Sequence, residues 1–140
     1  MEDLVCFIGQ KAFIEKNGEL LILTEPRLDR AIIDLPGGKV QVGEENLIES
    51  LQREVQEETR LKIEVGKPFY TWFYTIPAES SHRSAGKRIF NVGYRCTYLS
   101  GEVQLSEEHN GFRWVNKSNY KELCESSHFF PMIATYLEAS

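Results

Sequence analysis

The chain lacks the features that place a protein in a membrane or in a disulfide-rich secreted scaffold. No apolar run among its 140 residues reaches the roughly 18–20 residues that a membrane-spanning helix needs. The three cysteines, Cys6, Cys96 and Cys124, are odd in number and widely spaced, which is typical of neither a disulfide framework nor a zinc site. The start, MEDLVC, has no basic region before an apolar one, so we expect no signal peptide. These absences predict a cytoplasmic protein that makes no membrane contact.

The chain also lacks an excess of basic charge. It carries 16 Lys and Arg against 21 Asp and Glu, which gives a net charge of −5. Proteins that coat a nucleic-acid backbone are usually basic, so a nucleic-acid polymer is not an expected partner. A small anionic substrate is compatible with this charge if a bound cation reverses the sign locally. Apolar residues at 41% and charged residues at 26% are typical of one globular domain, which we expect to span residues 1–140.

The hydrophobic pattern predicts a mixed α/β (α+β) fold. Strands are predicted at 4–14, 19–24, 31–35, 61–65, 69–76, 88–99 and 112–115. A long helix is predicted from 45 or 46 to about 60, a short one from 118 or 119 to 123, and a last one from Pro131 to near 137. This order predicts a mixed sheet with helices packed on it.

The long helix carries three carboxylates on one face. Glu54, Glu57 and Glu58 stand at i, i+3 and i+4, next to the apolar stripe and not opposite it. A solvated acidic face is one interpretation of such a run. The other is a site for a hard cation, because Mg²⁺ and Mn²⁺ prefer oxygen ligands. Pro36, Gly37 and Gly38 before the helix favour the second interpretation, since glycines let the backbone approach a ligand closely.

The stretch from residue 35 to 61 resembles the Nudix box, whose usual form is G-x5-E-x7-R-E-U-x-E-E-x-G-U, with U a bulky apolar residue. Leu35-Pro36-Gly37-Gly38-Lys39 is similar to the start of the box, and the second half is in register: Arg53, Glu54, Val55, Glu57, Glu58 and Leu61. The upstream glutamate is Glu44 or Glu45, and we favour Glu45 because it keeps the seven-residue spacing to Arg53. Arg60 replaces the family's glycine, which puts the exit from the helix in question.

The resemblance implies a Nudix hydrolase of the MutT-like type, with a mixed sheet sandwiched between helices and a loop–helix–loop box at about 37–61. It implies hydrolysis, with Mg²⁺ or Mn²⁺, of a nucleoside diphosphate linked to another group. Glu54 and Glu58, then Glu57 and the carbonyl of Gly37, would be the metal ligands. Arg53 would orient Glu54 or pair with Glu45. A homodimer is expected only by analogy with the family.

The general base is a box glutamate or a glutamate of a later loop, by the same resemblance. Glu107 and Glu108 lie in a stretch similar to the family's S-x-E-H before W-V, and Glu108 is preferred because it precedes His109. We expect His109 itself to be structural, with its ring hydrogen-bonded to a backbone carbonyl.

Substrate selection should depend on residues outside the box. Arg27, Lys39 and Arg88 are candidates for phosphate contacts. Phe73 belongs to an aromatic run at 69–74 that either stacks on a base or packs in the core. Family markers near Tyr74 and Pro77 leave dinucleoside polyphosphates and ADP-ribose both open. The alternative function is a non-catalytic domain that senses a nucleotide without cleaving it.

Overall fold

The computed structural model describes residues 1–27, 30–78 and 85–139. Its strands are β1 (Phe7–Lys16), β2 (Glu19–Arg27), β3 (Arg30–Asp34), β4 (Gly37–Lys39), β5 (Lys62–Thr75), β6 (Arg88–Ser100) and β7 (Gly111–Val115). The helices are α1 (Leu47–Thr59), a 3-10 turn η1 (Tyr120–Glu122) and α2 (Phe130–Glu138). Within this part of the chain no helix is long and apolar enough to cross a membrane, and no disulfide joins the three cysteines.

The described strands form one mixed sheet in the order β3-β2-β1-β6-β5. β1 and β6 run parallel, and the other pairings are antiparallel. β1 and β2 pair with each other only next to their hairpin, and β4 then pairs with β1 while β3 pairs with β2. The segment that joins β3 to β4 therefore lies where β1 and β2 diverge, and it consists of Leu35 and Pro36.

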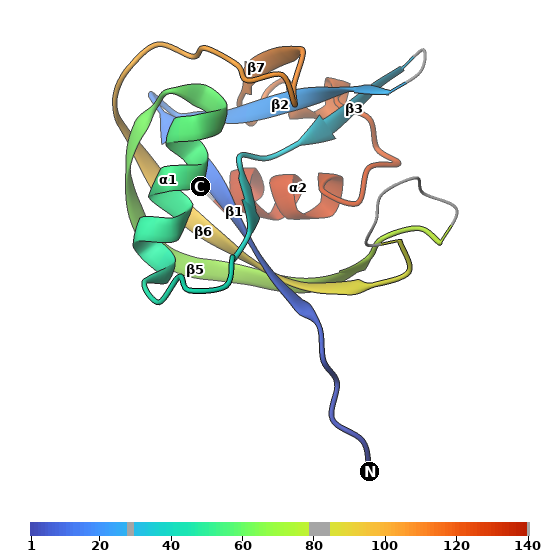
Figure 1. Cartoon of the computed structure of the whole chain (residues 1–140). Coiled ribbons are helices and arrows are strands. Elements are labelled where there is room, and N and C mark those ends of the chain that lie inside the picture. The colour runs from blue at the N-terminus through green and yellow to red at the C-terminus, as the bar shows by residue number, and fades with distance from the viewer. Residues whose placement is uncertain (28–29, 79–84, 140) are drawn as a thin grey trace.

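The sheet is buried on both faces, and each face has its own helix (Figure 1). Alternate residues of β1 point to opposite sides: Phe13 packs in a cluster with α2, whereas Ala12 and Ile14 pack in a cluster with α1. Leu51 and Val55 are the fully buried apolar residues of α1. This arrangement confirms the predicted mixed sheet between helices.

Two predicted strands are one long strand in the structure. Residues 61–65 and 69–76 both fall largely in β5, which pairs with β6 along its length. The register of this pairing shifts between Val65 and Tyr70, around Pro68. Proline has no N–H to donate, so the ladder is interrupted there while the strand continues beyond it. The first strand begins at Phe7 and not at Leu4, and the preceding residues extend away from the sheet (Figure 1).

The ends of α1 follow from its flanking residues. The Asn46 side chain caps the first turn by accepting a hydrogen bond from the Glu49 N–H, at 3.0 Å. At the other end Arg60 adopts the left-handed conformation, with φ 66° and ψ 11°, and its N–H donates to the Gln56 carbonyl. Arg60 thus makes the turn that glycine makes in the usual Nudix box, so the exit from the helix is retained.

We expect Arg60→Gly to stabilise the protein. The left-handed conformation costs a residue with a Cβ about 1–2 kcal/mol, and glycine removes this cost. Glycine also makes the unfolded chain more flexible, which lowers the stability by about 0.4–1 kcal/mol and offsets part of the gain. The free energy of unfolding should rise by about 0.5–1 kcal/mol, as measured by urea denaturation. Asn17→Gly is the matched control, because Asn17 has φ 51° and asparagine tolerates this region, so its gain should be smaller. A less stable Arg60→Gly variant would contradict this account.

Candidate functional site

The site begins at Gly37 and Gly38, the first two residues of β4, which follow the bend at Pro36; this short segment is called the glycine turn below. The Gly37 N–H donates to Oε2 of Glu58 at 2.9 Å. A Cβ on Gly37 would lie 2.0 Å from the Gln10 carbonyl oxygen, and one on Gly38 would lie 2.7 Å from Oε2 of Glu54. Gly37 therefore requires glycine, because the clash is with the backbone of β1 and its φ is 142°. The missing Cβ at Gly38 lets the Glu54 carboxylate approach the backbone.

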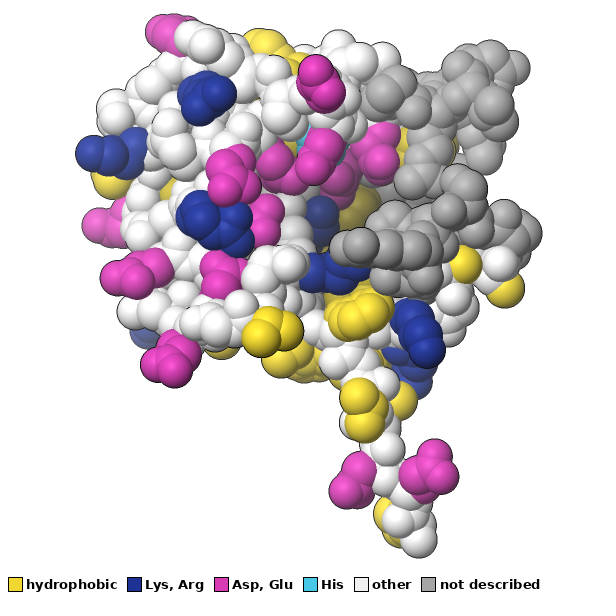
Figure 2. Space-filling view, viewed as in Figure 1, with side chains coloured by type: hydrophobic (Ala, Val, Ile, Leu, Met, Phe, Trp, Pro, Cys, Tyr) yellow, Lys and Arg dark blue, Asp and Glu magenta, His cyan; other side chains and the backbone are white. Residues whose placement is uncertain are grey.

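Arg53 holds three carboxylates around one guanidinium. Its Nη1 donates to both oxygens of Glu57, at 2.9 and 3.0 Å, and its Nη2 donates to Glu44 at 3.0 Å and to Glu54 at 3.1 Å. Figure 2 shows acidic side chains gathered around a basic one on this face of the molecule. The expected pairing of Arg53 with Glu54 is present, but the expected partner Glu45 is wrong, since Glu44 occupies that place.

The reason for this correction lies in where the helix begins. Glu45 precedes the cap residue Asn46, so it is outside α1 and a spacing counted along the helix does not apply to it. Before the helix, residues 41–44 form a turn that brings Glu44 next to Arg53. In this turn the Gln41 N–H donates to Oε1 of Glu44 at 2.7 Å. This contact leaves Oε2 of Glu44 to accept from Arg53. The hydrogen bond from Gln41, ahead of the contacts from Arg53, lowers the pKa of Glu44.

The three helix carboxylates differ in burial. Glu58 is buried, Glu54 keeps 17% of its side chain exposed, and Glu57 keeps 58% exposed. Burial raises the pKa of Glu58 to about 8, against the opposing effects of Lys11 and the Gly37 N–H. Burial also raises the pKa of Glu54. Two of the three carboxylates thus lie where ionisation is costly without a counter-charge.

A buried polar chain, Lys11–Asp34–His109, lies behind Glu58. Lys11 Nζ donates to Oδ1 of Asp34 at 2.9 Å, and Nε2 of His109 lies 2.9 Å from Oδ2 of the same carboxylate. Burial alone would raise the pKa of Asp34, but Lys11 and then His109 outweigh it and hold that pKa below its usual range. Burial would lower the pKa of His109, but the hydrogen bond to Asp34 outweighs it and raises that pKa. The expected backbone carbonyl partner of His109 is therefore wrong, because its partner is a carboxylate.

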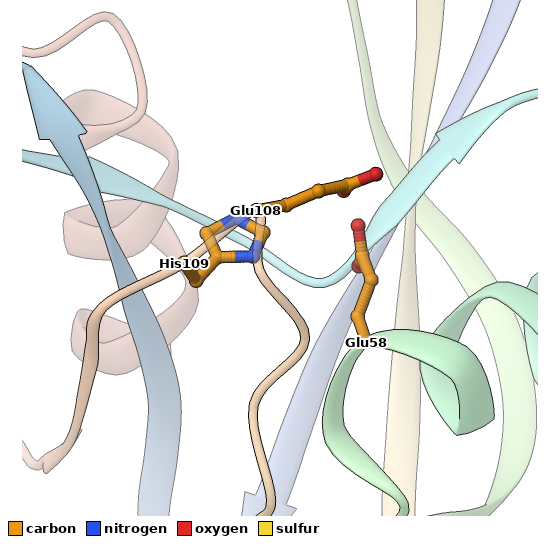
Figure 3. Close-up of side chains that lie close together, drawn as sticks. All are labelled: Glu58, Glu108 and His109. Carbon is orange, nitrogen blue, oxygen red and sulfur yellow. The ribbon is translucent and has the colours of Figure 1, made fainter.

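Glu108 and His109 meet Glu58 across the site. Figure 3 shows Glu58 rising from α1 toward the loop that carries the other two side chains. One ligand atom from each of the three lies within 4.8 Å of the others. His109 is 5% exposed, and among the described residues its Nδ1 is buried with no hydrogen-bond partner. Glu108, the preferred candidate of the later loop, belongs to this cluster and Glu107 does not.

A cavity of about 650 Å³ adjoins the glycine turn. Its lining includes Lys11, Asp34, Gly38, Lys39, Tyr74, Asn91 and His128. Tyr74 stacks on His128 with ring centroids 4.3 Å apart and planes at 18°. The wall thus contains two lysines, of which Lys11 is paired with Asp34, two carboxylates, Glu25 and Asp34, and one stacked pair of rings.

Two of the other predicted substrate-binding residues, Phe73 and Arg88, lie outside the cavity wall that the described residues form. Phe73 is 47% exposed, and the Arg88 guanidinium lies over its ring at 4.1 Å. Three other aromatics of the run, Phe69, Tyr70 and Trp72, pack against the core. The side chain of Arg27 lies outside the described residues.

Sequence reasoning missed Lys11 and Asp34. Each is a charged residue next to an apolar run of a strand: Lys11 precedes Ala12-Phe13-Ile14, and Asp34 follows Ala31-Ile32-Ile33. A charge in such a place is almost never buried unless it is paired, which is the signal that could have identified the two as partners.

The chain is similar to known proteins of one family. The family model of the NUDIX domain matches residues 12–134. Among curated proteins, none matches the chain. Similar solved structures include a MutT protein from Methanosarcina mazei Go1, with 26% identity, a TM-score of 0.73, and coverage of 95% of this chain and 93% of that one.

Two further structures share the fold at lower identity. The solution structure of the E. coli ORF135 protein has 22% identity and a TM-score of 0.75, covering 95% of this chain and 89% of that one. An ADP-ribose pyrophosphatase from Streptococcus suis 89-1591 has 20% identity and a TM-score of 0.69, covering 96% and 92%.

Proposed function

The chain belongs to the Nudix hydrolase family, and on that premise we propose that it is a divalent-metal-dependent pyrophosphohydrolase. Its substrate is a nucleoside diphosphate linked to another group. One observation carries the proposal: the carboxylates of Glu54 and Glu58 lie against a glycine turn that also forms part of the cavity wall. A cation held by these carboxylates, with Lys39 in the wall of the cavity, fits a substrate that is itself a polyanion.

The residues present fit Mg²⁺ or Mn²⁺. Glu54 and Glu58 would be the first ligands, with Glu57 and the Gly37 carbonyl as further ones. The burial that raises the pKa of Glu58 is a cost that a cation removes, because it supplies the missing counter-charge. When bound, the cation lowers the pKa of a coordinated water and neutralises the diphosphate.

The chain's own residues orient the substrate and move the proton. Arg53 fixes Glu54 through the contact at 3.1 Å and fixes Glu57 through both its oxygens. Glu108, across from Glu58, accepts a proton from the attacking water. The water oxygen forms a bond to phosphorus as the bond to the bridging oxygen of the diphosphate breaks. Lys39, in the cavity wall, would contact a phosphate, and the nucleoside would stack against the ring of Tyr74.

Several expectations from the sequence accompany this proposal. They are one domain over residues 1–140 with its box at about 37–61, a cytoplasmic location, substrate contacts from Arg27, Phe73 and Arg88, and a homodimer by family analogy. The similar ADP-ribose pyrophosphatase makes ADP-ribose the first compound to test.

A phosphate-release screen tests the function. The purified chain is incubated with Mg²⁺ or Mn²⁺, an auxiliary phosphatase, and a panel of (d)NTPs, ADP-ribose, nucleotide sugars and dinucleoside polyphosphates. We expect release from one compound class, abolished by EDTA and restored by excess metal. A metal-dependent rise in Tm with one compound, without product, would favour the nucleotide-sensing domain instead.

A further inference from the structure

The cluster of Glu58, Glu108 and His109 has a different donor set from the carboxylates around Arg53. Its ligand atoms come from two segments, the end of α1 and the loop before β7 (Figure 3). One of the three donors is an imidazole nitrogen. Opposite ligands of a cation with bonds of about 2.1 Å are separated by about 4.2 Å, so atoms within 4.8 Å of one another are close to the spacing that one ion needs.

The hydrogen bonding of His109 leaves Nδ1 available. An ionised carboxylate only accepts hydrogen bonds, so Nε2, at 2.9 Å from Asp34, carries the hydrogen of this contact. In the neutral ring Nδ1 then holds a lone pair. This atom is buried, and among the described residues it has no partner. A buried polar atom without a partner is costly, and a metal ion is one explanation for its retention.

Asp34 also occupies the position of an orienting group. Histidines that bind metals almost always donate their other ring N–H to a carboxylate or a carbonyl, which fixes the tautomer and the ring plane. The ion pair with Lys11, at 2.9 Å, holds that carboxylate in turn. This chain of contacts from Lys11 through Asp34 therefore ends at Nδ1 of His109. His109 belongs to the cluster with the carboxylates of Glu58 and Glu108.

We propose that Glu58, Glu108 and His109 form a mixed nitrogen and oxygen site that binds a first-row transition cation, with Mn²⁺ as the probe, in preference to Mg²⁺. The imidazole makes the difference, because Mg²⁺ prefers oxygen ligands whereas transition cations also accept nitrogen. The inference rests on the proposed function and deepens it, since Glu58 and Glu108 take part in both, but it concerns which metal binds and not whether hydrolysis occurs.

Pulsed EPR of bound Mn²⁺ tests the site in the unaltered protein. The full chain is prepared with natural and with ¹⁵N-labelled histidine, and one equivalent of Mn²⁺ is added without nucleotide. We expect a histidine nitrogen coupling that changes with the isotope. It should vanish in His109→Gln and persist in His128→Gln, which serves as the matched control because His128 lies in the cavity wall away from the cluster.

Metal affinities give a second measurement. His109→Gln should weaken Mn²⁺ binding by about tenfold or more, as changes around metal-binding histidines typically do. Mg²⁺ affinity, measured by competition, should fall less, because glutamine offers an oxygen. Absence of histidine coupling in the unaltered protein, or its persistence in His109→Gln, would overturn the inference. Hydrolysis without coupling leaves the proposed function standing, and coupling without hydrolysis of any compound leaves only the metal site standing.

Discussion

Glu58→Gln and Glu54→Gln should each lower kcat by at least about a hundredfold on the compound that the screen identifies. Each substitution removes one negative charge from the proposed metal site while keeping the size of the side chain. Removing a single group that stabilises transition-state charge commonly costs about 10²–10³ in kcat, and loss of a metal ligand acts on the same charge. Initial rates at saturating metal and substrate measure the effect.

Glu49→Gln is the matched control. Glu49 belongs to the same helix, but its exposed side chain lies in the first turn, away from the glycine turn. The rate of this variant should be close to that of the unaltered chain. Circular dichroism should show that all three variants are folded. If the unaltered chain hydrolyses a compound and both Glu54→Gln and Glu58→Gln do so at full rate, the assigned metal ligands are wrong.

The local part of this site was predictable from the sequence. The three helix carboxylates and Arg53 lie within one short helix, where spacing alone determines which side chains are neighbours. The contact of Arg53 with Glu57, four residues further on, follows from this spacing. The contact of Arg53 with Glu54 was expected from the family resemblance and is also present. The glycine turn was predictable for a similar reason, because Pro36, Gly37 and Gly38 are consecutive and begin two residues after the strand end at Asp34.

The contacts of the site between residues far apart in the chain could not be predicted from the sequence in the same way. His109 meets Asp34 across 75 positions of sequence, and no periodicity links a loop residue to a strand that precedes it by such a distance. The choice between Glu44 and Glu45 failed for a different reason. It depended on a turn at residues 41–44 and on the first residue of the helix, and helix ends are the least predictable features of a sequence.

The charge of Glu58 that the proposed function needs should lower the stability of the metal-free fold. In metal-free buffer we expect Glu58→Gln to be more stable than the unaltered chain at pH 8, although it is inactive. Glutamine retains an oxygen that can accept the Gly37 N–H, and it removes the cost of ionising a carboxyl group inside the fold. The difference in free energy of unfolding between the two proteins should depend on pH in a defined direction.

The direction follows from proton binding. Burial raises the pKa of Glu58 in the folded chain from 4.5 to about 8, so between these values the folded state holds a proton that the unfolded state has lost. Stability therefore falls as pH rises through this window, by at most about 1.4 kcal/mol per pH unit. The two proteins should differ least below pH 4.5, where the carboxyl group is protonated in both states.

Urea denaturation in EDTA from pH 4.5 to 8.5 measures the difference, and repetition with Mg²⁺ or Mn²⁺ supplies the control. A cation that binds ionised Glu58 stabilises the folded state by mass action, so metal should restore the stability of the unaltered chain at pH 8 and have less effect on Glu58→Gln. A constant difference across the pH range would mean that Glu58 is already ionised in the free protein. Loss of the pH-dependent difference on adding metal would mean that the costly ionisation of Glu58 serves cation binding.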